Sequence, residues 1–260
     1  MPILSFLCAT LNDNRLINAI NSIIYSSIDP RLVEILITEG GSENLDIREL
    51  SATTNFSLQY FVKPDSGPYD AMNSLILASS AKYCMILNSD DVIIEEGMLR
   101  ILTCLEDNRP DILFADVTIV NHSGMESSFN SRLIPYLARY IHPIIGMPVP
   151  HSGFICKTSI LKQHLFRLPV GLEADYTNML DILCSQKFNI LNCSSIPVVK
   201  FSATGLSSKR RFFSSSNPHI GEIRALTNAS IDIRLKTLGV LIRIIKLFLL
   251  LPVKALTSVQ

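Results

Sequence analysis

The chain has 260 residues, 48% of them hydrophobic, so it can bury the core of one α/β domain, with or without a small appendage. Its formal net charge is zero, so the molecule as a whole has no charge that would favour nucleic acid as a partner. The six cysteines include no pair with CxxC spacing, and we interpret all of them as reduced, which indicates a reducing compartment.

Apolar segments of strand length alternate with segments of helix length over the first 120 residues. The opening apolar run is too short for a signal peptide and has no basic residues before it, so we expect a buried strand there. The expected strands are residues 3–8, 32–38, 57–62, 83–87 and 111–120, and the expected helices are residues 14–25, 68–80 and 95–105. This alternation predicts βαβ units and a largely parallel sheet.

The C-terminal segment differs from the rest in charge and apolarity. From residue 206 onward the chain has nine basic residues and two acidic ones, a net charge of +7. The remainder of the chain therefore has a net charge of −7. Residues 238–251 are nearly all apolar and would span about 21 Å as a helix, short of a hydrocarbon core of about 30 Å. Lys236, Arg243 and Lys246 are spaced to share one helix face, which is typical of a helix lying in the membrane interface. A terminal helix packed on the core or in an oligomer is the alternative.

Polar turns follow four of the expected strands, and in parallel sheets ligands bind beyond this edge. Asn88-Ser89-Asp90-Asp91 follows the fourth strand, and its adjacent carboxylates suit Mg²⁺ or Mn²⁺ holding a diphosphate. A solvated turn that caps a helix is the alternative for this motif. The other three turns are Thr10-Leu11-Asn12, Glu39-Gly40-Gly41-Ser42 and Lys63-Pro64-Asp65-Ser66-Gly67. Neither GxGxxG nor GxxxxGK[ST] occurs, which argues against a dehydrogenase or a P-loop enzyme.

Three of these strings resemble the family 2 glycosyltransferases of the GT-A fold, most closely the bacterial exopolysaccharide and O-antigen enzymes. They are Glu39–Ser42, the stretch from Pro64 to Asn73 that reads PDSGPYDAMN, and Asn88–Asp91. The resemblance covers roughly residues 3–208. It implies an α/β GT-A fold, with a Rossmann-like, mostly parallel central sheet flanked by helices. We expect a glycosyltransferase domain over residues 1–220 and a helical, basic and apolar segment that associates with membrane over residues 221–260.

The resemblance also implies roles for individual residues. Thr10 and Glu39 would bind the nucleotide, Asp65 would line the donor pocket, and Asp90 would contact the ribose or the donor sugar. Gly41 would let the backbone approach the donor closely. Asp91 would bind the divalent metal, Mn²⁺ or Mg²⁺. Further along, Pro150–Phe154 resembles an acceptor-side stretch that contains His151, residues 173–176 resemble the segment with the catalytic base, and residues 201–207 resemble a loop near the donor phosphates.

The candidate base is Asp175, with Glu173 as the reserve and a helix cap as the alternative role for Asp175. We expect an inverting transfer of one sugar from a UDP- or GDP-linked donor to a glycan or polyprenyl-linked acceptor, in surface polysaccharide biosynthesis. The chain has no tryptophan and therefore lacks the QxxRW motif of processive synthases. The expected location is cytoplasmic, peripheral on the inner face of the cell membrane. A non-catalytic scaffold that binds sugar nucleotides, or a nucleotidyltransferase, is the alternative.

Two features leave their roles open. Glu39 stands where the resembled family usually has an aspartate, which bears on nucleotide identity. The basic run at residues 209–211 could attract a diphosphate or an anionic lipid, or could be a plain solvated run.

Overall fold

The computed structural model describes residues 1–121, 123–129, 147, 149–168, 173–185, 187–193, 196–203 and 218–257, with the backbone alone for 218–219 and 246–257. The basic run at 209–211, most of the expected acceptor region at 121–150 and the loop at 204–207 lie outside these residues.

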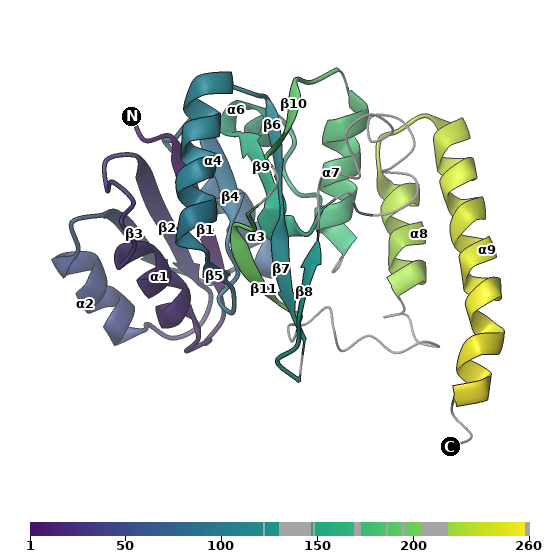
Figure 1. Ribbon diagram of the computed structural model, residues 1–260, viewed down its shortest axis with the longest axis horizontal. Coiled ribbons are helices and arrows are strands. Elements are labelled where there is room, and N and C mark those ends of the chain that lie inside the picture. The colour runs from purple at the N-terminus through teal and green to yellow at the C-terminus, as the bar shows by residue number, and fades with distance from the viewer. Residues whose placement is uncertain are drawn as a thin grey trace.

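A seven-stranded sheet forms the centre of the molecule (Figure 1), in the order β10-β6-β9-β4-β1-β2-β3. Its strands are β1 (Leu4–Thr10), β2 (Val33–Glu39), β3 (Ser57–Val62), β4 (Tyr83–Ile86), β6 (Ile112–Ala115), β9 (Phe154–Lys157) and β10 (Ile190–Cys193). Among these strands, only β9 runs antiparallel to both of its neighbours, β4 and β6, and the other pairs are parallel. Every residue of β2 is buried, as expected for a strand covered by helices on both faces. The predicted fold class is confirmed.

Helices cover both faces of this sheet. One core cluster joins the sheet to α1 (Leu16–Ile24), α2 (Leu45–Thr53) and α4 (Glu95–Asn108). A second cluster joins the opposite face to α3 (Pro68–Ala78), α6 (Thr158–Gln163) and α7 (Ala174–Ser185). Before α3, Gly67 has φ +118°, a conformation that L side chains rarely adopt, and Pro68 follows in the first helical turn.

The register of the sheet brings the polar turns to one edge. Thr10 at the end of β1 pairs with Glu39 at the end of β2, and Glu39 pairs with Val62 at the end of β3. The backbone N–H of Leu87, just after β4, donates to the carbonyl of Leu7 in β1. The turns after these four strands therefore leave the sheet together.

A smaller sheet, in the order β5-β11-β7-β8, lies beyond this edge. Its strands are β5 (Val92–Ile93), β7 (Val117–Val120), β8 (Glu126–Phe129) and β11 (Val199–Ser202). The single strand expected over residues 111–120 is divided at Asp116, whose carbonyl accepts the N–H of Val198. Because of this break, β6 stays in the large sheet while β7 joins the small one.

Two C-terminal helices, α8 (Pro218–Asn228) and α9 (Ile233–Thr257), lie beside α7 at the end of the molecule opposite α2 (Figure 1). The expected domain boundary at residues 220 and 221 falls inside α8. Ala225 and Leu226 of α8, with Ala229 just after that helix, form a buried cluster with Tyr176 and Leu180 of α7. Within the described part of the chain, no helix has both the length and the apolarity needed to cross a membrane.

Candidate active site

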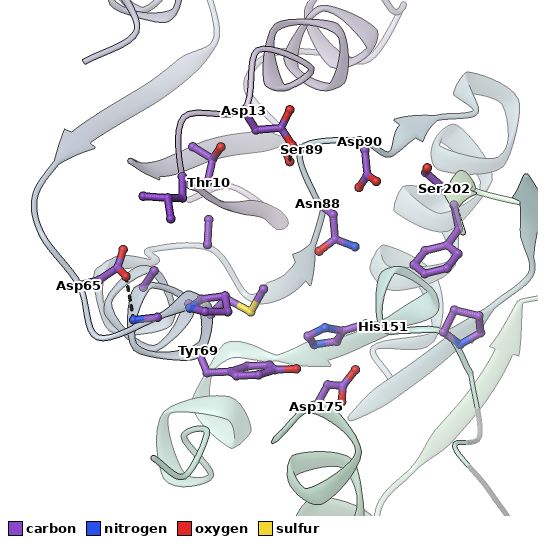
Figure 2. Close-up of a pocket in the computed structure, with 18 of the residues that line it drawn as sticks. Thr10, Asp13, Asp65, Tyr69, Asn88, Ser89, Asp90, His151, Asp175 and Ser202 are labelled. Carbon is purple, nitrogen blue, oxygen red and sulfur yellow. Dashed lines mark hydrogen bonds between the residues drawn. The ribbon is translucent and has the colours of Figure 1, made fainter. Parts of the chain in front are cut away.

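A pocket of about 750 Å³ opens at the edge where the strand ends meet. Figure 2 shows side chains from the turns after β1, β3 and β4, from the 3₁₀ turn His151–Gly153 and from the start of α7 around this space. Six of the predicted site residues line it: Thr10, Asp65, Asp90, His151, Glu173 and Asp175. Glu39, Gly41 and Asp91 do not.

Asp91, the expected metal ligand, is directed into the protein. Its side chain is fully buried, and its two oxygens accept hydrogen bonds from the backbone N–H of Ser202 at 2.9 Å and from Asn88 Nδ2 at 3.0 Å. Burial raises the pKa of Asp91 to about 7. Through these two hydrogen bonds Asp91 ties the turn to the end of β11, and unlike Asp90 it does not line the pocket.

Asp90 lies on the pocket side of the same turn. Its Oδ2 forms an ion pair with Arg15 Nη1 at 3.1 Å. Arg15 also binds both oxygens of Asp13, at 2.9 Å from Nε and 2.7 Å from Nη2, and Ser89 Oγ donates to Asp13 at 2.6 Å. These hydrogen bonds from Arg15 hold the pKa of Asp13 well below its usual value. Asp13 and Arg15 were not among the predicted site residues, because no motif marks them beyond their place just after the first strand.

Glu39 and Gly41 shape the loop that borders the pocket. Glu39 is buried, and its Oε1 accepts the N–H groups of Asn12 at 3.0 Å and Gly41 at 2.7 Å. A Cβ on Gly41 would lie 2.4 Å from Asn12 Oδ1, so only glycine fits there without displacing Asn12. Glu39 lines a second hollow of about 340 Å³, which shares Asn12 with the main pocket.

Asp175 and His151 lie across the pocket from Asp90, near Tyr69 (Figure 2). Asp175 is in the first turn of α7, where its Oδ1 accepts the N–H of Tyr176 at 2.7 Å. Burial lowers the pKa of His151 to about 4, so its imidazole is neutral at pH 7 and can donate or accept a hydrogen bond without adding charge. Phe166 packs against both the His151 ring, edge-on at 5.7 Å, and the Tyr69 ring, at 5.2 Å.

A cation at Asp90 would need ligands from a phosphate, and it would compete with Arg15 for Asp90 Oδ2. In the described part of the chain, no group of three or more His, Cys, Asp or Glu residues could hold a metal unaided. Mg²⁺ and similar ions are commonly bound by one or two carboxylates, with substrate phosphates and water completing the coordination. Thr10 Oγ1, buried at the same end of the pocket, has no hydrogen-bond partner among the described residues, so it remains available to a ligand.

Comparisons with known proteins agree with this architecture. The 1–349 fragment of S. aureus TarS in complex with UDP-GlcNAc is similar in structure, with a TM-score of 0.67 and 14% identity over 92% of this chain and 70% of that one. A mannosyltransferase from Pyrobaculum calidifontis, in complex with GDP-Man and Mn²⁺, has a TM-score of 0.61 and 13% identity over 92% of this chain and 68% of that one. At these identities the likeness establishes the fold alone. No curated protein matches the sequence significantly. Residues 5–164, more than half of the chain, match the family described as glycosyl transferase family 2, and the chain therefore belongs to that family.

Proposed function

We propose that this glycosyltransferase moves one sugar from a UDP- or GDP-linked donor to a hydroxyl of a glycan or polyprenyl-linked acceptor, with inversion at the anomeric carbon. The observation that carries the proposal is the placement of Asp90 and Asp175 on opposite sides of one pocket (Figure 2). A donor diphosphate at Asp90 and an acceptor hydroxyl at Asp175 would then place the sugar between two carboxylates with different tasks.

At the donor end, Asp90 would hold Mn²⁺ or Mg²⁺ together with the donor diphosphate. A cation there would neutralise the charge that develops on the leaving diphosphate. Similar structures contain UDP-GlcNAc, or GDP-Man with Mn²⁺, which supports a sugar nucleotide and a divalent metal here. Thr10 and Asp65 would contact the donor, whereas Glu39 and Gly41 would shape the loop that receives it. We assign Asp91 to holding the turn, because its oxygens already accept from Asn88 and Ser202.

At the acceptor end, Asp175 would act as the general base. It would take the proton of the acceptor hydroxyl while that oxygen attacks the anomeric carbon and the bond from this carbon to the diphosphate breaks. Neutral His151 would orient the hydroxyl by a hydrogen bond. Glu173 remains the reserve base, and it too lines the pocket although its side chain is largely buried.

We further propose that α9 brings the enzyme to an anionic membrane on the cytoplasmic side, where a polyprenyl-linked acceptor for surface polysaccharide would be found. Five large apolar side chains among the described residues of this helix are exposed: Ile233, Leu238, Leu241, Ile244 and Ile245. The net positive charge of the C-terminal segment supports an anionic surface as the partner. Arg243 takes no part in this surface, since it is fully buried on the other side of the helix.

A thermal-shift screen of UDP-, GDP- and dTDP-sugars, each with and without Mn²⁺, tests the function. Binding to the folded state should raise the melting temperature by mass action, and the rise should depend on metal. Release of nucleoside diphosphate from the selected donor should then be lost in Asp175→Asn, while donor binding persists. Metal-dependent binding without turnover in the wild type would favour a scaffold, and the absence of any shift would exclude the proposed donors.

A further inference from the structure

The two C-terminal helices, α8 and α9, contact the first turn of α7, which contains Asp175. Tyr176, the next residue, is nearly inaccessible and packs in one cluster with Ala225 and Leu226 of α8. Gly221 of α8 approaches Glu173 so closely that a Cβ there would lie 2.5 Å from Glu173 Oε1. Position 221 therefore has no room for a side chain while Glu173 keeps its place.

Arg243 of α9 reaches the same turn. Its side chain is fully buried, and Nη2 donates a hydrogen bond to the Tyr176 hydroxyl at 2.6 Å. The guanidinium carbon lies 5.7 Å from the centroid of the Tyr176 ring, and Nε forms an ion pair with Glu222 Oε2 at 3.3 Å. Tyr176 and Glu222 both line the pocket, so both described partners of this buried charge belong to the site.

The desolvation of Arg243 is only partly compensated. Its Nε and Nη1 make no hydrogen bond to any described residue. Burying a guanidinium costs several kcal/mol unless its donors are paired, and a well-packed apolar residue often serves stability as well as a buried ion pair does. Core packing alone therefore gives a weak reason for an arginine at this position.

We propose that Arg243 is a positioning residue for the transfer reaction, acting through Tyr176 on Asp175. Asp175 Oδ1 accepts the backbone N–H of Tyr176, so a shift of Tyr176 carries the carboxylate with it. A misplacement of about 1 Å can lower a rate by about 100-fold. The inference rests on the proposed role of Asp175, and it makes α9 part of the active site in addition to its membrane-facing surface.

Rate measurements on the purified full chain test this inference. UDP-GlcNAc and GDP-mannose serve as donors, and their hydrolysis is followed by release of nucleoside diphosphate, because water can replace the unidentified acceptor and still needs the base. Arg243→Met and Tyr176→Phe should each lower kcat by about tenfold or more, with the affinity for UDP or GDP unchanged. Arg243→Lys, which keeps the charge, should restore part of the rate. Arg234→Met, on the exposed part of the same helix, is the matched control and should keep the wild-type kcat.

Two further measurements distinguish positioning from a purely structural role. The Arg243→Met, Tyr176→Phe double variant should be no slower than the slower single variant, because both changes break one contact. Amide hydrogen exchange in Arg243→Met should accelerate at residues 174–178 and remain at the wild-type rate in the strands of the large sheet.

The outcomes separate this inference from the proposed function. A lower melting temperature with unchanged kcat in Arg243→Met and Tyr176→Phe would overturn the positioning role. If Arg243→Met does not fold, Tyr176→Phe decides alone, since it removes only the hydroxyl. Wild-type turnover in Asp175→Asn would overturn the proposed base, and the positioning role with it. Loss of turnover in Asp175→Asn but not in Tyr176→Phe would overturn the inference alone.

Discussion

Asp91 Oδ1 accepts a hydrogen bond from the backbone N–H of Ser202, 111 residues further along the chain, at 2.9 Å. The contact ties the acidic turn after β4 to the end of β11 in the small sheet. It holds the Asp91 side chain inside the protein, while Asp90 remains at the pocket. Two adjacent carboxylates thus have different surroundings and should respond differently to substitution.

Asp90→Ala should abolish the metal-dependent thermal shift and the turnover with little change in the free energy of unfolding. Asp91→Ala should instead lower that free energy by about 1–3 kcal/mol, because it leaves the partly buried N–H of Ser202 without its acceptor. Urea unfolding and donor titration of both variants check this difference. Asp91→Asn, which retains an oxygen for Ser202, should recover much of the stability. An unaltered unfolding curve for Asp91→Ala would contradict the structural role.

The pH dependence of stability should include a contribution from His151. Its folded-state pKa of about 4 lies below the usual histidine value of 6.5, so the unfolded chain takes up a proton first as pH falls. The free energy of unfolding should therefore decrease by about 1–2 kcal/mol between pH 7 and pH 5 through this group. His151→Gln lacks the titration, so its stability relative to the wild type should improve over that range. An equal change in the free energy of unfolding between pH 7 and pH 5 in both proteins would contradict the low pKa of His151.

Gly97→Ala should destabilise the protein although position 97 lies within a helix. Alanine usually stabilises a helix interior by about 1 kcal/mol relative to glycine. Here a Cβ would lie 2.2 Å from the carbonyl oxygen of Pro197, and backbone atoms cannot move aside cheaply. We expect a loss of about 1–3 kcal/mol, measured by denaturant unfolding. Gly124→Ala, in a loop where an added Cβ meets nothing within 4 Å, is the steric control, since only its φ of +76° opposes the change.

The exposed apolar face of α9 should determine membrane binding. The Leu238→Glu, Leu241→Glu double variant should bind vesicles containing phosphatidylglycerol at least about tenfold more weakly, because each buried leucine contributes about 1.5–3 kcal/mol. Co-sedimentation of the full chain with such vesicles measures this. Thr237→Glu, at an exposed polar position, adds charge without removing apolar surface and should weaken binding much less. Equal sedimentation of the double variant and the wild type would exclude this face as the membrane contact.

The sequence by itself determined the fold class, because strand-length apolar runs alternating with helices leave few arrangements other than a covered parallel sheet. It also determined that the turns after β1 to β4 meet at one edge, since parallel strands end on the same side. The strings from Glu39 to Asp91 were enough to indicate the family. These features are local in sequence, so pattern and resemblance could identify them.

The tertiary structure decided which way individual side chains face. The resemblance gave Asp90 and Asp91 different roles, but the sequence could not show which of them faces the pocket. That difference depends on Ser202, and the strand containing Ser202 is placed by the small sheet. Nor could helical spacing show that Arg243 is buried, since its partner Tyr176 is 67 residues away on α7. Asp13 and Arg15 likewise join the site only because Ser89 and Asp90 lie beside them in the fold. Long-range packing fixes the orientation of these groups, and neither periodicity nor motif spacing contains that information.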